Sequence, residues 1–263
     1  LFSFLINGVW RKVRFPTGPA YQALPDARLT FGGGMLEIRQ GERRRYASML
    51  SIKEFAGQVE PGTLGALLYE DSEFIETQSF SSLPRRQAMA ALTTQRDQLL
   101  ASDDVVVTQI EAMDVALDQL GDGQFAMGEY SYTLAVFGDT QGECSKRAAS
   151  AVGALTETTA MELVPVDLVA DAAWFSQQPG NFQWRPRKAT ISSRAFAALT
   201  CGHSFLGGKR DGNPWGEALA LMRTPAGNPF YLNLHASPDG EDSEGKKLPG
   251  NTIVIGSTGS GKT

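Results

Sequence analysis

Eight consecutive residues at the C-terminal end of the chain have the types and the spacing of a phosphate-binding loop. The pattern requires Gly at its first and sixth positions, then Lys, then Ser or Thr. The octet consists of Gly256, Ser257, Thr258, Gly259, Ser260, Gly261, Lys262 and Thr263. The apolar run 252–255 precedes it, as a β-strand precedes the loop in folds that bind nucleotides. We therefore predict a nucleotide site rather than a disordered Gly/Ser-rich tail, which would not explain that apolar run.

Each residue type in this octet has a physical reason. Glycine allows positive φ angles, so that successive backbone N–H groups can point inward at one phosphate. Lys262 is expected to contact the β- and γ-phosphates, and the hydroxyl of Thr263 is expected to take one coordination site on Mg²⁺. A helix beginning near Gly261 would add its partial positive charge to the site.

Composition indicates a soluble globular protein. Apolar residues make up 42% of the 263 residues, and the net charge of −5 argues against binding of nucleic acid through bulk charge. Cys144 and Cys201 lack metal-ligand spacing, which predicts buried free thiols in a reducing compartment. The two histidines, His203 and His235, are too few for a metal site and are expected to be structural. Because the chain begins without Met and ends inside a motif, it is expected to be an internal segment of a longer protein.

Hydrophobic periodicity and turn residues predict two β-α-β units separated by a helical hairpin. The first unit has a strand at 46–55, a short helix opened by Pro61 and a strand at 74–80, and the hairpin has helices at 83–101 and 105–120. The second unit has a strand at 125–137, a helix at 142–159 and a strand at 161–166, followed by a helix at 169–177. Shorter strand pairs are expected at 29–31 with 35–39 and at 218–223 with 229–235. This order predicts an α+β fold with a ferredoxin-like split β-α-β core and an inserted helical hairpin.

A second candidate site is a basic cluster flanked by two aromatic residues, Trp184 and Phe196. The cluster consists of Arg185, Arg187, Lys188 and Arg194, with Lys209 and Arg210 further along the chain. Such a cluster could meet nucleic acid, a phosphate group, or a neighbouring subunit or domain. The alternative is that its side chains are solvated and anchor a loop through carboxylates. The residues themselves leave both interpretations open.

Several stretches resemble the large traffic ATPase of type IV secretion systems, the CagE/TrbE/VirB family. The stretches are 45–54, 77–80, 127–129, 136–139, 184–196, 208–209, 213–216 and 231–235. They cover nearly the whole chain. Ser257 stands where a proline is common in this family, at a variable position of the loop.

The resemblance implies three parts of the chain. Residues 1–178 would form an N-terminal α+β assembly domain, and residues 179–217 a loop-rich connecting segment. Residues 218–263 would begin a RecA-like α/β nucleotide-binding domain, with its first strand and its phosphate loop, the Walker A motif. The acidic residue that positions magnesium and the general base would lie beyond residue 263, so the segment alone is expected to bind nucleotide weakly and not to hydrolyse it.

The resemblance also implies a function for the whole protein. It would be an ATPase, with ATP and Mg²⁺ as cofactors, on the cytoplasmic face of a bacterial inner membrane. It would energise pilus biogenesis, conjugation and substrate transfer as a homo-oligomer, a hexamer or a trimer of dimers. Its partners would be inner-membrane subunits, other secretion ATPases, and pilin or substrate.

Two alternatives to this function remain. One is a DNA-translocating ATPase with the same motor fold. The acidic net charge argues modestly against this alternative, and direct contact with nucleic acid stays open. The other is that the segment alone is a non-catalytic interaction domain.

Overall fold

The computed structural model describes residues 1–14, 17–57, 59–101, 107–200, 207–213, 216–224, 227–234, 253 and 255. Its first compact unit spans Leu1–His203 and its second Ser204–Thr263. The helices of the first unit are α1 (Phe2–Asn7), α2 (Ala20–Ala23), α3 (Arg85–Leu100), α4 (Val107–Gly121), α5 (Gln141–Thr159), α6 (Ala170–Ser176) and α7 (Ser193–Leu199), with 3₁₀ turns η1 (Thr63–Tyr69) and η2 (Phe182–Trp184). Its strands are β1 (Arg28–Gly32), β2 (Met35–Gln40), β3 (Arg43–Glu54), β4 (Phe74–Ser82), β5 (Met127–Gly138), β6 (Glu162–Pro165) and β7 (Ala189–Ser192).

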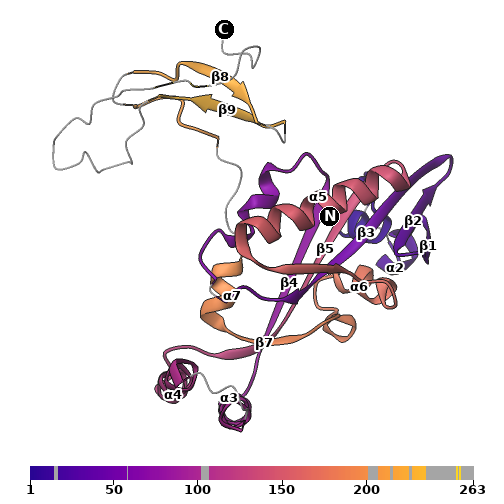
Figure 1. The fold of residues 1–263 in the computed structure, drawn as a ribbon. Helices are drawn as coiled ribbons and strands as arrows, with labels where there is room; N and C mark the ends of the chain where they lie inside the picture. Colours follow the sequence, from indigo (N-terminus) through magenta and orange to yellow (C-terminus); the bar gives the residue numbers. More distant parts are fainter. Residues whose placement is uncertain are drawn as a thin grey trace. The chain divides into compact units, whose positions relative to one another are not determined.

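The strands of the first unit form one antiparallel sheet, which makes the fold a mixed α/β fold (Figure 1). The main path of the sheet is β1-β2-β3-β5-β4, and β6 and β7 pair with β3 and β5 respectively. Along one edge of β3, residues 43–47 pair with β2 and residues 50–54 pair with β6. The four strands of the two predicted β-α-β units therefore lie in the order β6-β3-β5-β4.

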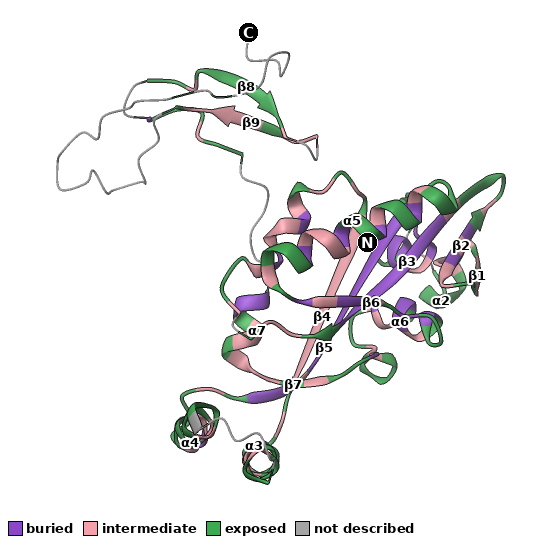
Figure 2. Cartoon of the chain, viewed as in Figure 1, coloured by how far each residue is buried: buried purple, intermediate pink, exposed green. Residues whose placement is uncertain are grey.

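Alternating side chains of β5 form two hydrophobic cores, one on each face of the sheet. Tyr130, Tyr132, Leu134 and Val136 point to the first face, which α5 and η1 cover with residues such as Leu155 and Leu64. On the second face, Ala135 and Phe137 pack with Trp174 of α6 and with apolar residues of β2 and β3. Figure 2 shows the resulting buried centre of the sheet. This two-sided burial explains why β5 is apolar along most of its length.

The helical hairpin α3–α4 has a small core of its own. Its buried residues are Ala88, Leu92, Leu117, Leu120 and Met127. In Figure 1 the two helices lie at one end of β4 and β5, away from α5. Leu83 N–H donates to the carbonyl of Met127 at 2.8 Å, which joins the start of the hairpin to the start of β5. The predicted hairpin is confirmed.

Two features differ from the sequence-based expectations. The short helix expected after Pro61 is the 3₁₀ turn η1. The segment expected to be loop-rich contains β7 and α7, because β7 pairs with β5 and Phe196 of α7 stacks on Phe80 at 4.8 Å between ring centroids. Both elements belong to the first compact unit, which extends to residue 203.

The second unit contains an antiparallel strand pair, β8 (Ala220–Arg223) and β9 (Pro229–Leu232). This pair was predicted, and the turn between the strands includes Gly227 with φ of 85°, a conformation that glycine adopts without strain. Gly208 lies against β9, and a Cβ there would come within 2.0 Å of the carbonyl oxygen of Tyr231. Close packing of this kind requires glycine.

Candidate functional site

The predicted phosphate loop, residues 256–263, lies outside the described residues. Of the run before it, Ile253 and Ile255 are described. They belong to no helix or strand and expose 82% and 89% of their surface. Strands in parallel α/β sheets are stabilised by neighbours on both edges and helices on both faces. The described part of the chain supplies no such neighbours to these two isoleucines.

Arg185 of the basic cluster is almost completely buried and binds four groups. Its side chain is 6% exposed and forms an ion pair with Glu129 at 3.2 Å. It also donates to the hydroxyl of Ser81 at 3.0 Å, to the carbonyl of Glu129 at 3.3 Å and to the carbonyl of Phe182 at 3.1 Å. Its guanidinium lies 5.1 Å from the ring centroid of Phe182. Arg185 therefore anchors the segment before β7 to strands β4 and β5.

The neighbouring cations differ from Arg185. Lys188 contacts the same carboxylate, with Nζ 3.3 Å from Oε2 of Glu129. Arg187 is exposed, has a positive φ of 42° and makes no ion pair within the described part of the chain. Between Arg185 and Arg187, the carbonyl of Pro186 accepts a hydrogen bond from the buried hydroxyl of Ser131 at 2.6 Å. Carboxylate and backbone contacts thus hold this segment on β5.

Arg194 lies in α7 and contacts a different part of the first unit. Its guanidinium donates to the side-chain oxygens of Gln119 at 2.9 Å and Gln124 at 3.4 Å, and lies 5.4 Å from the ring centroid of Phe125. These partners belong to the end of α4 and the loop before β5. Arg185, Lys188 and Arg194 therefore serve two separate anchoring contacts, and Arg187 takes part in neither.

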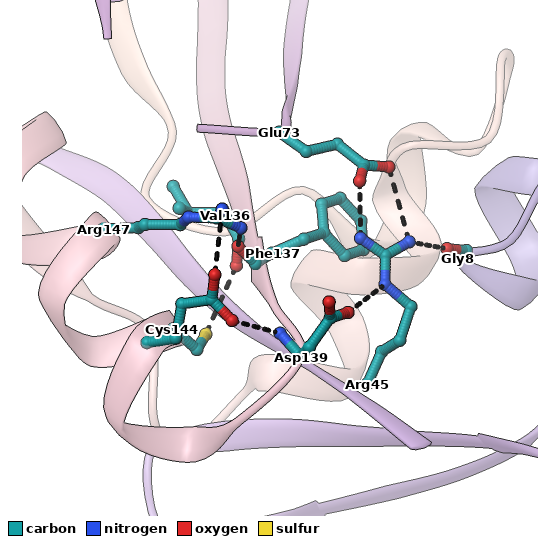
Figure 3. A network of polar contacts seen from close by, with 9 residues as sticks. Gly8, Arg45, Glu73, Val136, Phe137, Asp139, Cys144 and Arg147 are labelled. Atoms are coloured by element: carbon teal, nitrogen blue, oxygen red, sulfur yellow. Dashed lines mark hydrogen bonds and ion pairs between the residues drawn. The ribbon is translucent and has the colours of Figure 1, made fainter. Parts of the chain in front are cut away.

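A second arginine network, which the sequence-based reasoning did not single out, centres on Arg45 of β3 (Figure 3). Arg45 forms an ion pair with Glu73 at 2.5 Å and donates to the carbonyl of Gly8 at 3.0 Å. It also approaches Asp139 at 3.6 Å and lies 5.0 Å from the ring centroid of Phe137. Arg45 thereby joins α1, β3, the residue before β4 and the end of β5. The sequence signal for this network is Arg45 itself, a charged residue at an inward-pointing position of the largely buried strand β3.

The start of α5 belongs to the same network (Figure 3). The side chain of Thr140 accepts from the N–H of Glu143 at 3.2 Å, and the carboxylate of Glu143 accepts from the N–H of Asp139 at 2.9 Å. These two bonds differ from a capping box only in that the carboxylate accepts from the residue before the N-cap Thr140, and they satisfy backbone donors at the helix N-terminus. Arg147 binds Glu143 at 2.9 Å and the carbonyl of Phe137 at 3.0 Å.

Cys144 is a buried free thiol, as predicted, whereas Cys201 and both histidines lie outside the described residues. The thiol of Cys144 donates to the carbonyl of Val136 at 3.4 Å. Burial raises the pKa of this thiol to about 11, because burial disfavours the charged thiolate. A thiol with this pKa is a poor nucleophile at neutral pH, so its role is structural.

Two absences hold for the described part of the chain. It contains no group of three or more His, Cys, Asp or Glu side chains arranged to hold a metal ion. Among its helices, none combines the length and the apolar character that crossing a bilayer requires.

Comparisons with known proteins match the whole chain. It is 44% identical over 263 residues to the type IV secretion system protein PtlC homolog of Bordetella bronchiseptica, covering 100% of this chain and 32% of that protein. It is 43% identical over 262 residues to the type IV secretion system protein virB4 of Brucella abortus, covering 100% of this chain and 31% of that protein. The virB4 protein of Bartonella quintana is 37% identical over 259 residues, covering 98% of this chain and 32% of that protein.

The chain thus spans about a third of the length of these curated relatives. The family described as "CagE, TrbE, VirB family, component of type IV transporter system" matches residues 1–187. The matched residues include every strand of the large sheet except β7. They also include both arginine networks, except Lys188 and Arg194. This match agrees with the resemblance drawn from the sequence, and the chain belongs to the CagE, TrbE, VirB family of type IV transporter components.

Proposed function

We propose that this chain is part of an ATP-hydrolysing motor subunit of a type IV secretion system, and that residues 256–263 bind ATP with Mg²⁺. The observation that carries the proposal is the complete phosphate-loop octet, found in a member of a transporter family. Relatives that match the chain over its full length are named type IV secretion system proteins. In this proposal Lys262 neutralises phosphate charge and Thr263 coordinates Mg²⁺.

Within the motor subunit, the first unit acts as the assembly domain. This role is supported by its two hydrophobic cores and its internally satisfied arginine networks, which give a rigid scaffold. The strand order β6-β3-β5-β4 supports a ferredoxin-like core, because a split β-α-β fold places its fourth, first, third and second strands in that order. Residues 218–263 begin the RecA-like domain, in which parallel strands of the whole protein would complete the sheet.

The whole protein would work as a homo-oligomer, a hexamer or a trimer of dimers, on the cytoplasmic face of the bacterial inner membrane. Its partners would be inner-membrane subunits, other secretion ATPases, and pilin or substrate. ATP turnover would energise pilus biogenesis, conjugation and substrate transfer. The family match supports assembly with other subunits of the machine.

The test is ATP turnover by the full-length protein with and without Lys262→Ala. We expect Lys262→Ala to lower turnover by about 10²-fold or more, because it removes a preorganised charge from the developing phosphate charge. Ser257→Ala, at the variable position of the same loop, is the matched control and should retain turnover. Turnover that survives Lys262→Ala would contradict the proposal. Strong stimulation of turnover by single-stranded DNA would favour the DNA-translocating alternative.

A further inference from the structure

Three arginines lie side by side on adjacent strands at the outer end of the sheet. Arg28 of β1 is the register partner of Arg39 of β2, and Arg39 is in turn the partner of Arg44 of β3. Since register partners point to the same face, the three side chains form a row across three strands. We call Arg28, Arg39 and Arg44 the arginine ladder. Figure 2 shows exposed residues at this end of the sheet.

The ladder carries more positive charge than the structure neutralises locally. Arg39 and Arg44 share one carboxylate, Glu37, at 3.0 and 3.2 Å, and their side chains are 44% and 50% exposed. Arg28 is exposed and makes no ion pair among the described residues. Residues 28–44 contain four arginines and two glutamates, a net charge of +2 in a chain whose net charge is −5. Because like charges directly opposite one another destabilise a sheet, an anionic partner bound here would stabilise this face.

The opposite charge gathers on helix α4. Glu111, Asp114 and Asp118 are exposed and spaced three and four residues apart, so they form one outward stripe on α4. Helix α4 contains no Lys or Arg. Asp114 is bound by Arg96 of α3 at 3.3 Å, whereas Glu111 and Asp118 make no ion pair among the described residues. We call these three residues the acidic stripe.

The ladder and the stripe cannot reach each other within one chain. Tyr46 of β3 is the register partner of Gly138 at the end of β5, and Arg44 lies two residues beyond it. The helical hairpin joins the sheet at Met127, the start of β5. The 12 residues of β5 separate the two ends, and a strand of this length spans about 40 Å. The two charged surfaces therefore do not pair with each other inside the first unit, and a second copy of the chain can supply the complement of each.

We propose that the arginine ladder of one copy of this chain binds the acidic stripe on α4 of a second copy. Such a contact is heterologous, because the two surfaces that meet are different, and repetition of it builds a ring or a filament. The inference deepens the proposed assembly of the motor subunit with further copies and rests on it, but it does not depend on nucleotide. Charge complementarity of this kind contributes orientation and specificity to an interface.

The test uses two charge-reversed variants of the chain and sedimentation velocity without nucleotide. The ladder variant is R28E/R39E/R44E and the stripe variant is E111K/D118K, which leaves Asp114 with Arg96. The control is K146E/E157K, which reverses exposed charges on α5 and preserves the net charge. Circular dichroism melting of every variant checks the fold, and R28Q/R39Q/R44Q replaces the ladder variant if three added glutamates unfold it.

The wild type is expected to self-associate in a manner that weakens as ionic strength rises, since exposed pairs are screened by salt. Each reversed variant alone should associate about tenfold more weakly, and the control should associate like the wild type. An equimolar mixture of the two reversed variants should recover association, because the acidic ladder of one then meets the basic stripe of the other.

Three results would overturn the inference. The first is a wild type that stays monomeric at every concentration, and the second is association that both reversed variants retain. The third is loss of vesicle binding in the ladder variant without loss of self-association, measured with phosphatidylglycerol vesicles, which would assign the ladder to a lipid surface. Because nucleotide is absent throughout, none of these results bears on ATP binding at residues 256–263.

Discussion

Replacement of Arg185 by Met removes the anchor between the segment before β7 and strands β4 and β5. The substitution keeps the aliphatic volume of a side chain that is 6% exposed, but it removes hydrogen bonds to Ser81, Glu129 and Phe182. Hydrogen bonds to charged groups contribute about 1.5–3 kcal/mol each when buried. Glu129 is 37% exposed and keeps its contact with Lys188, so the total must be well below the sum of the separate bonds.

We therefore expect Arg185→Met to lower the free energy of unfolding by about 2–3 kcal/mol. The matched control is Arg187→Ala, two residues away, where the side chain is exposed and makes no ion pair among the described residues. Surface changes of this kind stay within about 0.5 kcal/mol. Urea denaturation followed by circular dichroism measures the free energy of unfolding of both variants. Equal stabilities of the two variants would refute the anchoring role and return Arg185 to the set of candidate binding residues.

Two further predictions concern glycine positions and a buried thiol. Gly138→Ala should destabilise the chain by about 2–3 kcal/mol, because the added Cβ would lie 2.5 Å from the backbone nitrogen of Cys144. Gly153→Ala, inside α5 with open space around it, should stabilise the chain by about 0.5–1 kcal/mol. Thermal melting of both variants checks this prediction, and equal changes in melting temperature would contradict the close packing at Gly138. The pKa of Cys144 rises from 9.0 to about 11 on folding, so the folded protein holds this proton more tightly and its stability is lost as pH rises from about 9 through about 11. Urea midpoints should fall by the equivalent of about 1 kcal/mol at pH 10 relative to pH 8, and Cys144→Ala should lack this part of the pH dependence; an unchanged profile in Cys144→Ala would show that another group titrates.

The long elements could be predicted from the sequence because their patterns are strong over many residues. Strand β5 has 12 residues with an apolar face, and α5 has 19 residues with a buried stripe of Cys144, Ala148, Ala151 and Leu155. The strand β7 was missed because it has four residues, and its stability comes from pairing with β5 rather than from its own pattern. Short elements of this kind depend on a partner that lies far away in the sequence.

The candidate sites likewise include one that the sequence pattern predicts and one that depends on partners distant in the sequence. The phosphate-loop octet is defined by residue types at fixed spacing, which a sequence displays directly. The basic cluster looked like one site because its residues are close in the sequence. Its contacts are set instead by Glu129, which lies 56 residues before Arg185, and by Gln119, which lies 75 residues before Arg194. Spacing along the chain does not indicate such distant partners. The contacts of Arg185 and those of Arg194 are therefore distinguished only in the three-dimensional structure.

The central claim is that residues 256–263 bind MgATP as part of a larger motor site. Its most direct measurement is equilibrium binding of MgATP by calorimetry to the full-length protein, to its Lys262→Ala variant and to the chain of residues 1–263. We predict measurable binding by the full-length protein, a loss of about 10²-fold in Lys262→Ala, and weak or undetectable binding by residues 1–263. Unchanged binding in Lys262→Ala, or tight binding by residues 1–263, would contradict the account.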